Sequence, residues 1–162
     1  MNAPAARFEE LDRDTCLELL HRKSVGRLAV ARPGGPPHLV PVNYTLLRGS
    51  VLFRTPPGTK LTLLVTEPVS FEVDEWDPVD GTGWSVVVEG LAYEASDREI
   101  EVENVHLDSA AEVQNGRWVR LMPEKVTGRR VGRPDRGSAP PVLVPDPGLA
   151  SWHGGGSARF PS

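Results

Sequence analysis

Cysteine, basic charge and long apolar runs are all scarce in this sequence, and each shortage excludes a class of protein. Cys16 is the one cysteine among 162 residues, which excludes an internal disulfide and a zinc site built from several cysteines. No stretch approaches the roughly 18 uninterrupted apolar residues of a membrane-spanning helix. The opening residues MNAPAARFEELDRD lack the apolar segment of a secretory signal. We therefore expect a cytoplasmic protein with no membrane partner.

The charge balance is slightly acidic. The chain has 18 Lys and Arg against 22 Asp and Glu, a net charge of -4. Without a basic field we expect no nucleic-acid partner. A length of 162 residues with 39% hydrophobic residues is enough for one domain with its own core.

Two common phosphate-binding motifs are also absent. A Walker A loop needs Gly-x-x-x-x-Gly-Lys-Ser/Thr, but Thr59 separates Gly58 from Lys60 and the earlier glycine is missing. The fingerprint Gly-x-Gly-x-x-Gly of a dinucleotide-binding βαβ unit does not occur. No Ser, His and Asp arrangement is recognisable either, so the catalytic residues stay unknown.

What the sequence does contain is a series of short extended segments joined by tight turns, which indicates antiparallel neighbours. Pro41 cannot donate a hydrogen bond to a ladder, so its strand is expected at an edge or bulged there. The pattern predicts a mainly β fold, a compact β-barrel with peripheral helices. Strands are expected at 25–31, 38–47, 51–55, 68–77, 84–95 and 116–131, and helices at 11–24, 59–67 and 96–113.

Two details of these segments carry further expectations. The segment 84–95 has apolar residues on both faces, which predicts a strand buried on both sides. Cys16 lies on the apolar stripe of the first helix and is expected to fill the core. Glu103 and His106 could share a helical face, but a solvated face fits them better and we predict no metal site.

The stretch FRTPPGTK has the chemistry of a phosphate seat. Gly58 can adopt a positive φ and removes the Cβ that would block an anion. The N–H groups of Thr59 and Lys60 would be free donors at the start of a helix. Arg54 offers a planar, two-pronged donor, and the hydroxyl of Thr55 adds another. A surface turn with solvated cations is the alternative.

The order and spacing of several blocks resemble the pyridoxamine 5'-phosphate oxidase-like superfamily of flavin-binding split barrels. The likeness is nearest to the small-protein branch that includes nitroimidazole-resistance-type proteins and covers roughly residues 11–131. It implies a split-barrel homodimer that binds FMN at the subunit interface. The blocks are VGRLAV, PVNY, FRTPPGTKL, VSFEVDEWD, GWSVVVEGLAYE and VTGRRV.

The resemblance also implies that individual residues contact the cofactor. Those for the FMN phosphate are Arg54, Thr55, Gly58, Thr59 and Lys60; those that offer backbone polar groups to the edge of the isoalloxazine ring are Val42, Asn43 and Tyr44; and Ser85 is a further phosphate or ribityl contact. Alternatives remain for two of them: a turn-side hydrogen bond for Asn43 and ordinary strand packing for Tyr44. Trp84 points away from Ser85 on a strand and is assigned to packing or an interface.

The functional hypothesis is an FMN-dependent oxidoreductase that acts on a small-molecule substrate. The alternative is a module that binds flavin, a deazaflavin or haem without turnover. Residues 1–132 would form the FMN-binding split-barrel domain. The remaining residues, 133–162, include six Pro and five Gly and are expected to form a flexible tail.

Overall fold

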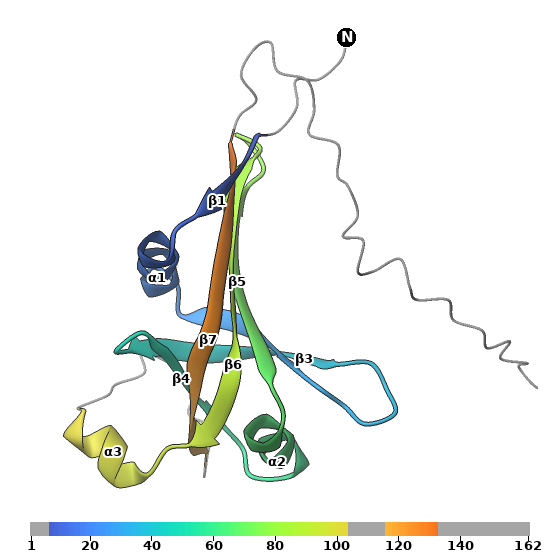
Figure 1. Cartoon of the computed structure of the whole chain (residues 1–162), viewed down its shortest axis with the longest axis vertical. Helices are drawn as coiled ribbons and strands as arrows, with labels where there is room; N and C mark the ends of the chain where they lie inside the picture. Colours follow the sequence, from blue (N-terminus) through green and yellow to red (C-terminus); the bar gives the residue numbers. More distant parts are fainter. Residues whose placement is uncertain (1–6, 104–115, 133–162) are drawn as a thin grey trace, which may run out of the picture.

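The computed structural model describes residues 7–103 and 116–132, and every structural statement below refers to these residues. Seven strands and three helices make up the described chain (Figure 1). In chain order they are β1 (Arg7–Leu11), α1 (Arg13–His21), β2 (Val25–Val30), β3 (His38–Leu47), β4 (Ser50–Thr55), α2 (Thr59–Thr66), β5 (Val69–Asp77), β6 (Thr82–Glu94), α3 (Asp97–Val102) and β7 (Arg117–Gly132).

Six of the strands close into an antiparallel barrel. Their order is β7-β4-β3-β2-β5-β6, and a long ladder between β6 and β7 closes the ring. Strand β7 runs the length of the barrel, with β4 beside its lower end and β1 beside its upper end (Figure 1). The predicted mainly β fold of split-barrel type is confirmed.

The barrel core is formed by alternate residues of the strands. Phe71 on β5 and Val88 on β6 are fully buried opposite one another in the ladder. Tyr44 meets Phe71 edge to face, with ring centroids 4.8 Å apart. Pro41 lies where β3 pairs with β2 alone, since pairing with β4 begins only at Tyr44, so the predicted edge position is confirmed.

Helix α1 covers one side of this core. The Asp12 side chain caps it by accepting from the N–H of Thr15 at 2.8 Å. Cys16 is completely buried, as predicted, and burial raises the pKa of its thiol. A Cβ on Gly128 of β7 would lie 2.4 Å from the Cys16 sulfur, so the glycine allows helix and strand to approach closely. No helix of the described residues is long and apolar enough to cross a membrane.

Three local expectations differ from the structure. Strand β6 buries one face only in the single chain, because Leu91 on its outer face is 50% exposed; two-sided burial was wrong here. Strand β1 was not predicted, because RFEEL is short and highly charged. The third predicted helix begins as α3, which ends at Val102. Residues 104–113 of that prediction, with His106, and the tail 133–162 lie outside the described residues.

A cluster of polar side chains fastens α3 to the barrel. Arg120 of β7 is 12% exposed and donates to the Glu99 carboxylate at 2.6 Å and to the Ser50 hydroxyl at 2.7 Å. The Tyr93 hydroxyl donates to the same Glu99 oxygen at 2.8 Å. The donated bonds of Arg120, then of Tyr93, lower the pKa of Glu99.

This cluster predicts a pH-dependent contribution to stability. A carboxyl whose pKa is lower in the folded state than in the unfolded state stabilises the fold at pH values above the unfolded-state pKa, here 4.5. This stabilisation is lost as the pH falls through the folded-state pKa. Glu99→Gln is therefore expected to lower the free energy of unfolding by about 1 kcal/mol at pH 7 and by much less near pH 3. Urea unfolding at both pH values measures this, and an equal loss at both would contradict it.

Candidate functional site

The turn between β4 and α2 has the backbone expected of an anion seat. Gly58 is the N-cap of α2 and has a φ of 131°, in the region that favours glycine. Nothing lies within 4 Å of the position that a Cβ would occupy there, and no side chain caps the helix. The first N–H groups of α2 therefore have no side-chain cap, and the position beside the Gly58 Cα is open.

Two buried side-chain atoms flank this turn without a hydrogen-bond partner. Within the described part of the chain, Arg54 Nε and Thr55 Oγ1 are the buried side-chain nitrogen or oxygen atoms that lack one. An unsatisfied buried donor costs about 1–3 kcal/mol, so such groups mark places where an acceptor is missing. Their presence on consecutive residues fits a ligand that supplies anionic oxygens at the end of β4.

The Arg54 guanidinium is held on two sides. Its Nη2 donates to the carbonyl of Gly116 at 2.9 Å. Its Cζ lies 5.3 Å from the ring centroid of Trp118, the residue that faces Arg54 in the β4–β7 ladder. The register of β3 with β4 places Asn43 one step beyond Tyr44 and Phe53, so Asn43 and Arg54 share this outer face.

Arg54 and Thr55 point to opposite faces of β4, because side chains alternate along a strand. Thr55 is 1% exposed, in line with the core residues Val51 and Phe53, whereas Arg54 is only half-buried. The two can therefore meet the same group only beyond the end of the strand, where the chain leaves through the Gly58 turn. A phosphate that contacts both residues would therefore lie beyond the strand end and not on either face of β4.

Thr59 and Lys60 are the first two residues of α2, so their backbone lies where the prediction placed it. Their side chains are outside the described part of the structure. Their proposed contacts to a phosphate stay a prediction.

Of the three residues predicted beside the isoalloxazine ring, two face the core. Val42 is 7% exposed and Tyr44 is 3% exposed. The Tyr44 hydroxyl donates to the carbonyl of Leu20 at 2.6 Å, and burial raises the pKa of this hydroxyl. Asn43 between them is half-buried and points outward. The Tyr44 side chain packs in the core, and of the three only Asn43 offers a side chain to a ligand. The predicted contacts of the isoalloxazine ring with backbone groups of Val42, Asn43 and Tyr44 stay a prediction.

The position of Tyr44 predicts an effect on stability without an effect on binding. Tyr44→Phe removes a buried hydrogen bond and is expected to lower the free energy of unfolding by about 1–2 kcal/mol. The affinity for FMN, measured by flavin fluorescence, is expected to stay within about twofold of the native value. A large loss of affinity with unchanged stability would indicate that the Tyr44 side chain contacts the ligand.

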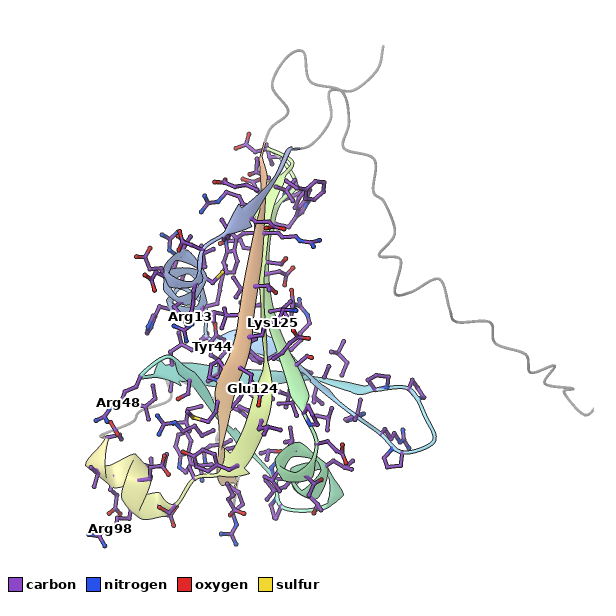
Figure 2. The ribbon with its side chains drawn as sticks, in the orientation of Figure 1. Arg13, Tyr44, Arg48, Arg98, Glu124 and Lys125 are labelled. Carbon is purple, nitrogen blue, oxygen red and sulfur yellow. The ribbon has the colours of Figure 1, made fainter. Side chains whose placement is uncertain are left out.

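Ser85 lies on a different part of the barrel. It faces outward from β6, opposite Arg129 of β7, beside a cavity of about 470 Å³. Lys125 and Thr127 line the same cavity, and Lys125 pairs with Glu89 at 3.3 Å. Lys125 projects from the middle of β7 (Figure 2). Glu10 and Glu89 line the cavity as well, so Ser85 sits among side chains of both charges.

The structure separates Ser85 from the Gly58 turn. Arg54 faces Trp118 and Ser85 faces Arg129, two positions eleven residues apart on β7. At roughly 3.3 Å per residue this is on the order of 35 Å along the strand, far longer than a flavin mononucleotide. One chain therefore does not bring all the predicted contacts onto one cofactor.

Sequence reasoning missed three groups next to the predicted residues: Gly116 and Trp118 beside Arg54, and Arg129 beside Ser85. These contacts depend on the pairing of β7 with β4 and β6, which no local sequence pattern predicts. The described residues contain no group of three His, Cys, Asp or Glu side chains that could hold a metal ion. Glu103 pairs with Arg48 at 3.0 Å.

The chain matches the pyridoxamine 5'-phosphate oxidase family over residues 12–130. It therefore belongs to this family, and the superfamily resemblance drawn from the sequence blocks is confirmed. Among curated proteins, an uncharacterised protein of Mycobacterium tuberculosis, Rv0080, is 35% identical over 137 residues, which cover 75% of this chain and 84% of the relative.

Solved structures with this fold include proteins described as flavin-binding. An FAD-binding protein of Mycobacterium smegmatis is 32% identical, with a TM-score of 0.65, and the match covers 75% of this chain and 98% of that protein. An FAD-binding protein of Mesorhizobium loti is 26% identical, with a TM-score of 0.68 and coverages of 79% and 99%. A haem-binding protein of Mycobacterium smegmatis, 20% identical with a TM-score of 0.57 and coverages of 70% and 52%, shares the fold alone.

Proposed function

We propose that the protein is a flavin-dependent oxidoreductase that uses FMN and acts on a small-molecule substrate. The observation that carries the proposal is the pair of unsatisfied buried atoms, Arg54 Nε and Thr55 Oγ1, on the residues that lead into the Gly58 turn. A phosphate monoester supplies several anionic oxygens to such donors at one point.

The residues at the turn fit this group by their chemistry. Arg54 would neutralise the phosphate from the outer face, Thr55 would donate its hydroxyl, and Gly58 would let the oxygens reach the first N–H groups of α2. Asn43, on the face of Arg54, would orient the part of the ligand next to the phosphate. A bound flavin would supply hydride or single-electron transfer, for which the chain's own side chains have no equivalent.

We further propose that two copies of the chain complete the site. The Gly58 turn and Ser85 are too far apart along β7 to hold one FMN within one chain. In a twofold-symmetric pair, the turn of one copy can face the outer β6–β7 surface of the other. That surface carries the exposed apolar side chains of Leu91 and Met122, which are 50% and 45% exposed in the single chain. A monomer in light scattering that still binds FMN tightly would contradict this arrangement.

The alternative function is a module that binds flavin, deazaflavin or haem without turnover, and the family likeness also supports it. The relatives described as FAD-binding make a dinucleotide flavin the first alternative to FMN. The haem-binding neighbour supports a haem module by its fold alone.

An absorbance spectrum of the purified protein, followed by mass identification of the released ligand, separates these functions. A yellow flavin spectrum and the mass of FMN are expected. A Soret band would identify the cofactor as haem, and the mass of a deazaflavin or of FAD would identify that flavin as the cofactor in place of FMN. Turnover is then tested by reducing the bound flavin anaerobically and measuring its reoxidation by quinone and nitro-compound acceptors; a flavin that no acceptor reoxidises faster than in free solution would favour the non-catalytic module.

A further inference from the structure

The Arg54 guanidinium is held by an aromatic ring and by a backbone carbonyl. The Trp118 ring lies under the Arg54 guanidinium, with 5.3 Å between Cζ and the ring centroid. The Gly116 carbonyl accepts a hydrogen bond from Arg54 Nη2 at 2.9 Å. These two contacts fix the plane and one corner of the guanidinium, while Nε stays buried and has no acceptor among the described residues. The arginine is thus held in place with a donor left over.

Trp118 itself is fixed by a small apolar cluster outside the barrel. Leu52 of β4 and Ile100 of α3 are buried there, and Trp118 packs against them. Ala95, just before α3, joins the same cluster and donates its N–H to the Trp118 carbonyl at 2.9 Å. Because α3 is in turn fastened by the bonds between Glu99 and Arg120, the indole has little freedom to move.

We propose that Trp118 is a positioning residue that makes the site selective for a phosphorylated ligand, acting through Arg54. This inference rests on the proposed flavin function and specifies which chemical part of the ligand the residue controls. An arginine on a flexible surface must be ordered when a phosphate binds, and that ordering costs affinity. An arginine already stacked on an indole loses less freedom, so the same contact to phosphate yields tighter binding.

The physical scale of this effect is modest but measurable. A stacked arginine–tryptophan pair in a half-buried setting corresponds to roughly a five- to thirtyfold change in affinity. The effect applies only to ligands that carry the phosphate, because Trp118 meets the ligand only through Arg54. The affinity for riboflavin, which lacks the phosphate, is therefore expected not to depend on Trp118.

The test measures dissociation constants of FMN and of riboflavin by flavin fluorescence for four proteins. These are the native chain, Trp118→Leu, Arg54→Ala and the double variant. Trp118→Leu is expected to weaken FMN binding about tenfold and to leave riboflavin within about twofold. In the double variant the loss is expected to equal that of Arg54→Ala alone, because the two residues act as one unit.

A second substitution guards against a variant that does not fold. Trp118→Phe keeps an aromatic ring in the cluster and is expected to weaken FMN about threefold in the native chain and not at all in the Arg54→Ala chain. Trp76→Leu, which alters a 56% exposed tryptophan of the β5–β6 hairpin, is the matched control and is expected to change neither affinity.

The outcomes separate the inference from the function on which it rests. Equal losses of FMN and riboflavin in Trp118→Leu, or additive losses in the double variant, would overturn the positioning role while leaving the flavin function intact. A native chain that binds neither FMN nor riboflavin would overturn the proposed function and the inference together. An FMN-specific, non-additive loss supports both.

Discussion

Replacing Arg54 and Lys60 together by alanine is expected to weaken FMN binding by about 100-fold or more while the protein stays folded. Each charge-assisted hydrogen bond to a phosphate contributes roughly 1.5–3 kcal/mol, and each 1.4 kcal/mol corresponds to a tenfold change in affinity. The barrel core is expected to survive, because Arg54 faces outward from it. Flavin fluorescence titration gives the affinity, and circular dichroism during thermal unfolding reports the fold.

The matched control removes two other cations. Arg13 on α1 and Arg98 on α3 are exposed side chains away from the Gly58 turn (Figure 2). Arg13→Ala with Arg98→Ala changes the net charge by the same amount, so any loss through long-range electrostatics alone appears in both double variants. Equal FMN affinities for the native chain and the variant with Arg54→Ala and Lys60→Ala would contradict the proposed phosphate site at the Gly58 turn.

Gly90→Ala is expected to destabilise the barrel strongly. Gly90 lies inside the barrel at the β-bulge between Glu89 and Gly90, where β6 and β7 shift register. A Cβ there would lie 2.0 Å from the carbonyl oxygen of Met122, a backbone atom that cannot move aside as a side chain can. The expected loss of unfolding free energy is about 3 kcal/mol or more.

Urea unfolding measures the loss, with Gly35→Ala as the control. A Cβ at Gly35 would have only the Cδ of Arg32 nearby, at 3.7 Å, so that variant is expected to stay within about 0.5 kcal/mol of the native protein. A Gly90→Ala variant as stable as Gly35→Ala would contradict this prediction. It would show that the backbone of β6 and β7 can shift at the bulge to make room for a methyl group.

Local patterns predicted most of the secondary structure, because each barrel strand is bounded by turn residues and has an apolar face. Strand β3 matches the expected range 38–47, and α2 begins directly after Gly58, where the chain changes direction. Strand β1 was not predicted, because it is held by pairing with β7, which is distant in sequence, and has no hydrophobic pattern of its own. Two-sided burial of β6 failed because its outer face has no partner within the single chain.

The candidate site was predicted in part for the same reason. Arg54, Thr55 and Gly58 are neighbours in sequence, so their shared turn could be read locally. The partners of Arg54 could not, because the hydrogen bond to Gly116 joins residues 62 positions apart and depends on the register of β4 with β7. The distance between Ser85 and the turn is likewise a property of the ladder.

The most direct test is a crystal structure of the protein with FMN, read for where the phosphate lies. We predict phosphate oxygens within about 3.2 Å of Arg54 Nε, of Thr55 Oγ1 and of the first N–H groups of α2, in a cleft shared by two copies of the chain. A phosphate bound elsewhere, with Arg54 Nε and Thr55 Oγ1 still lacking an acceptor, would contradict it.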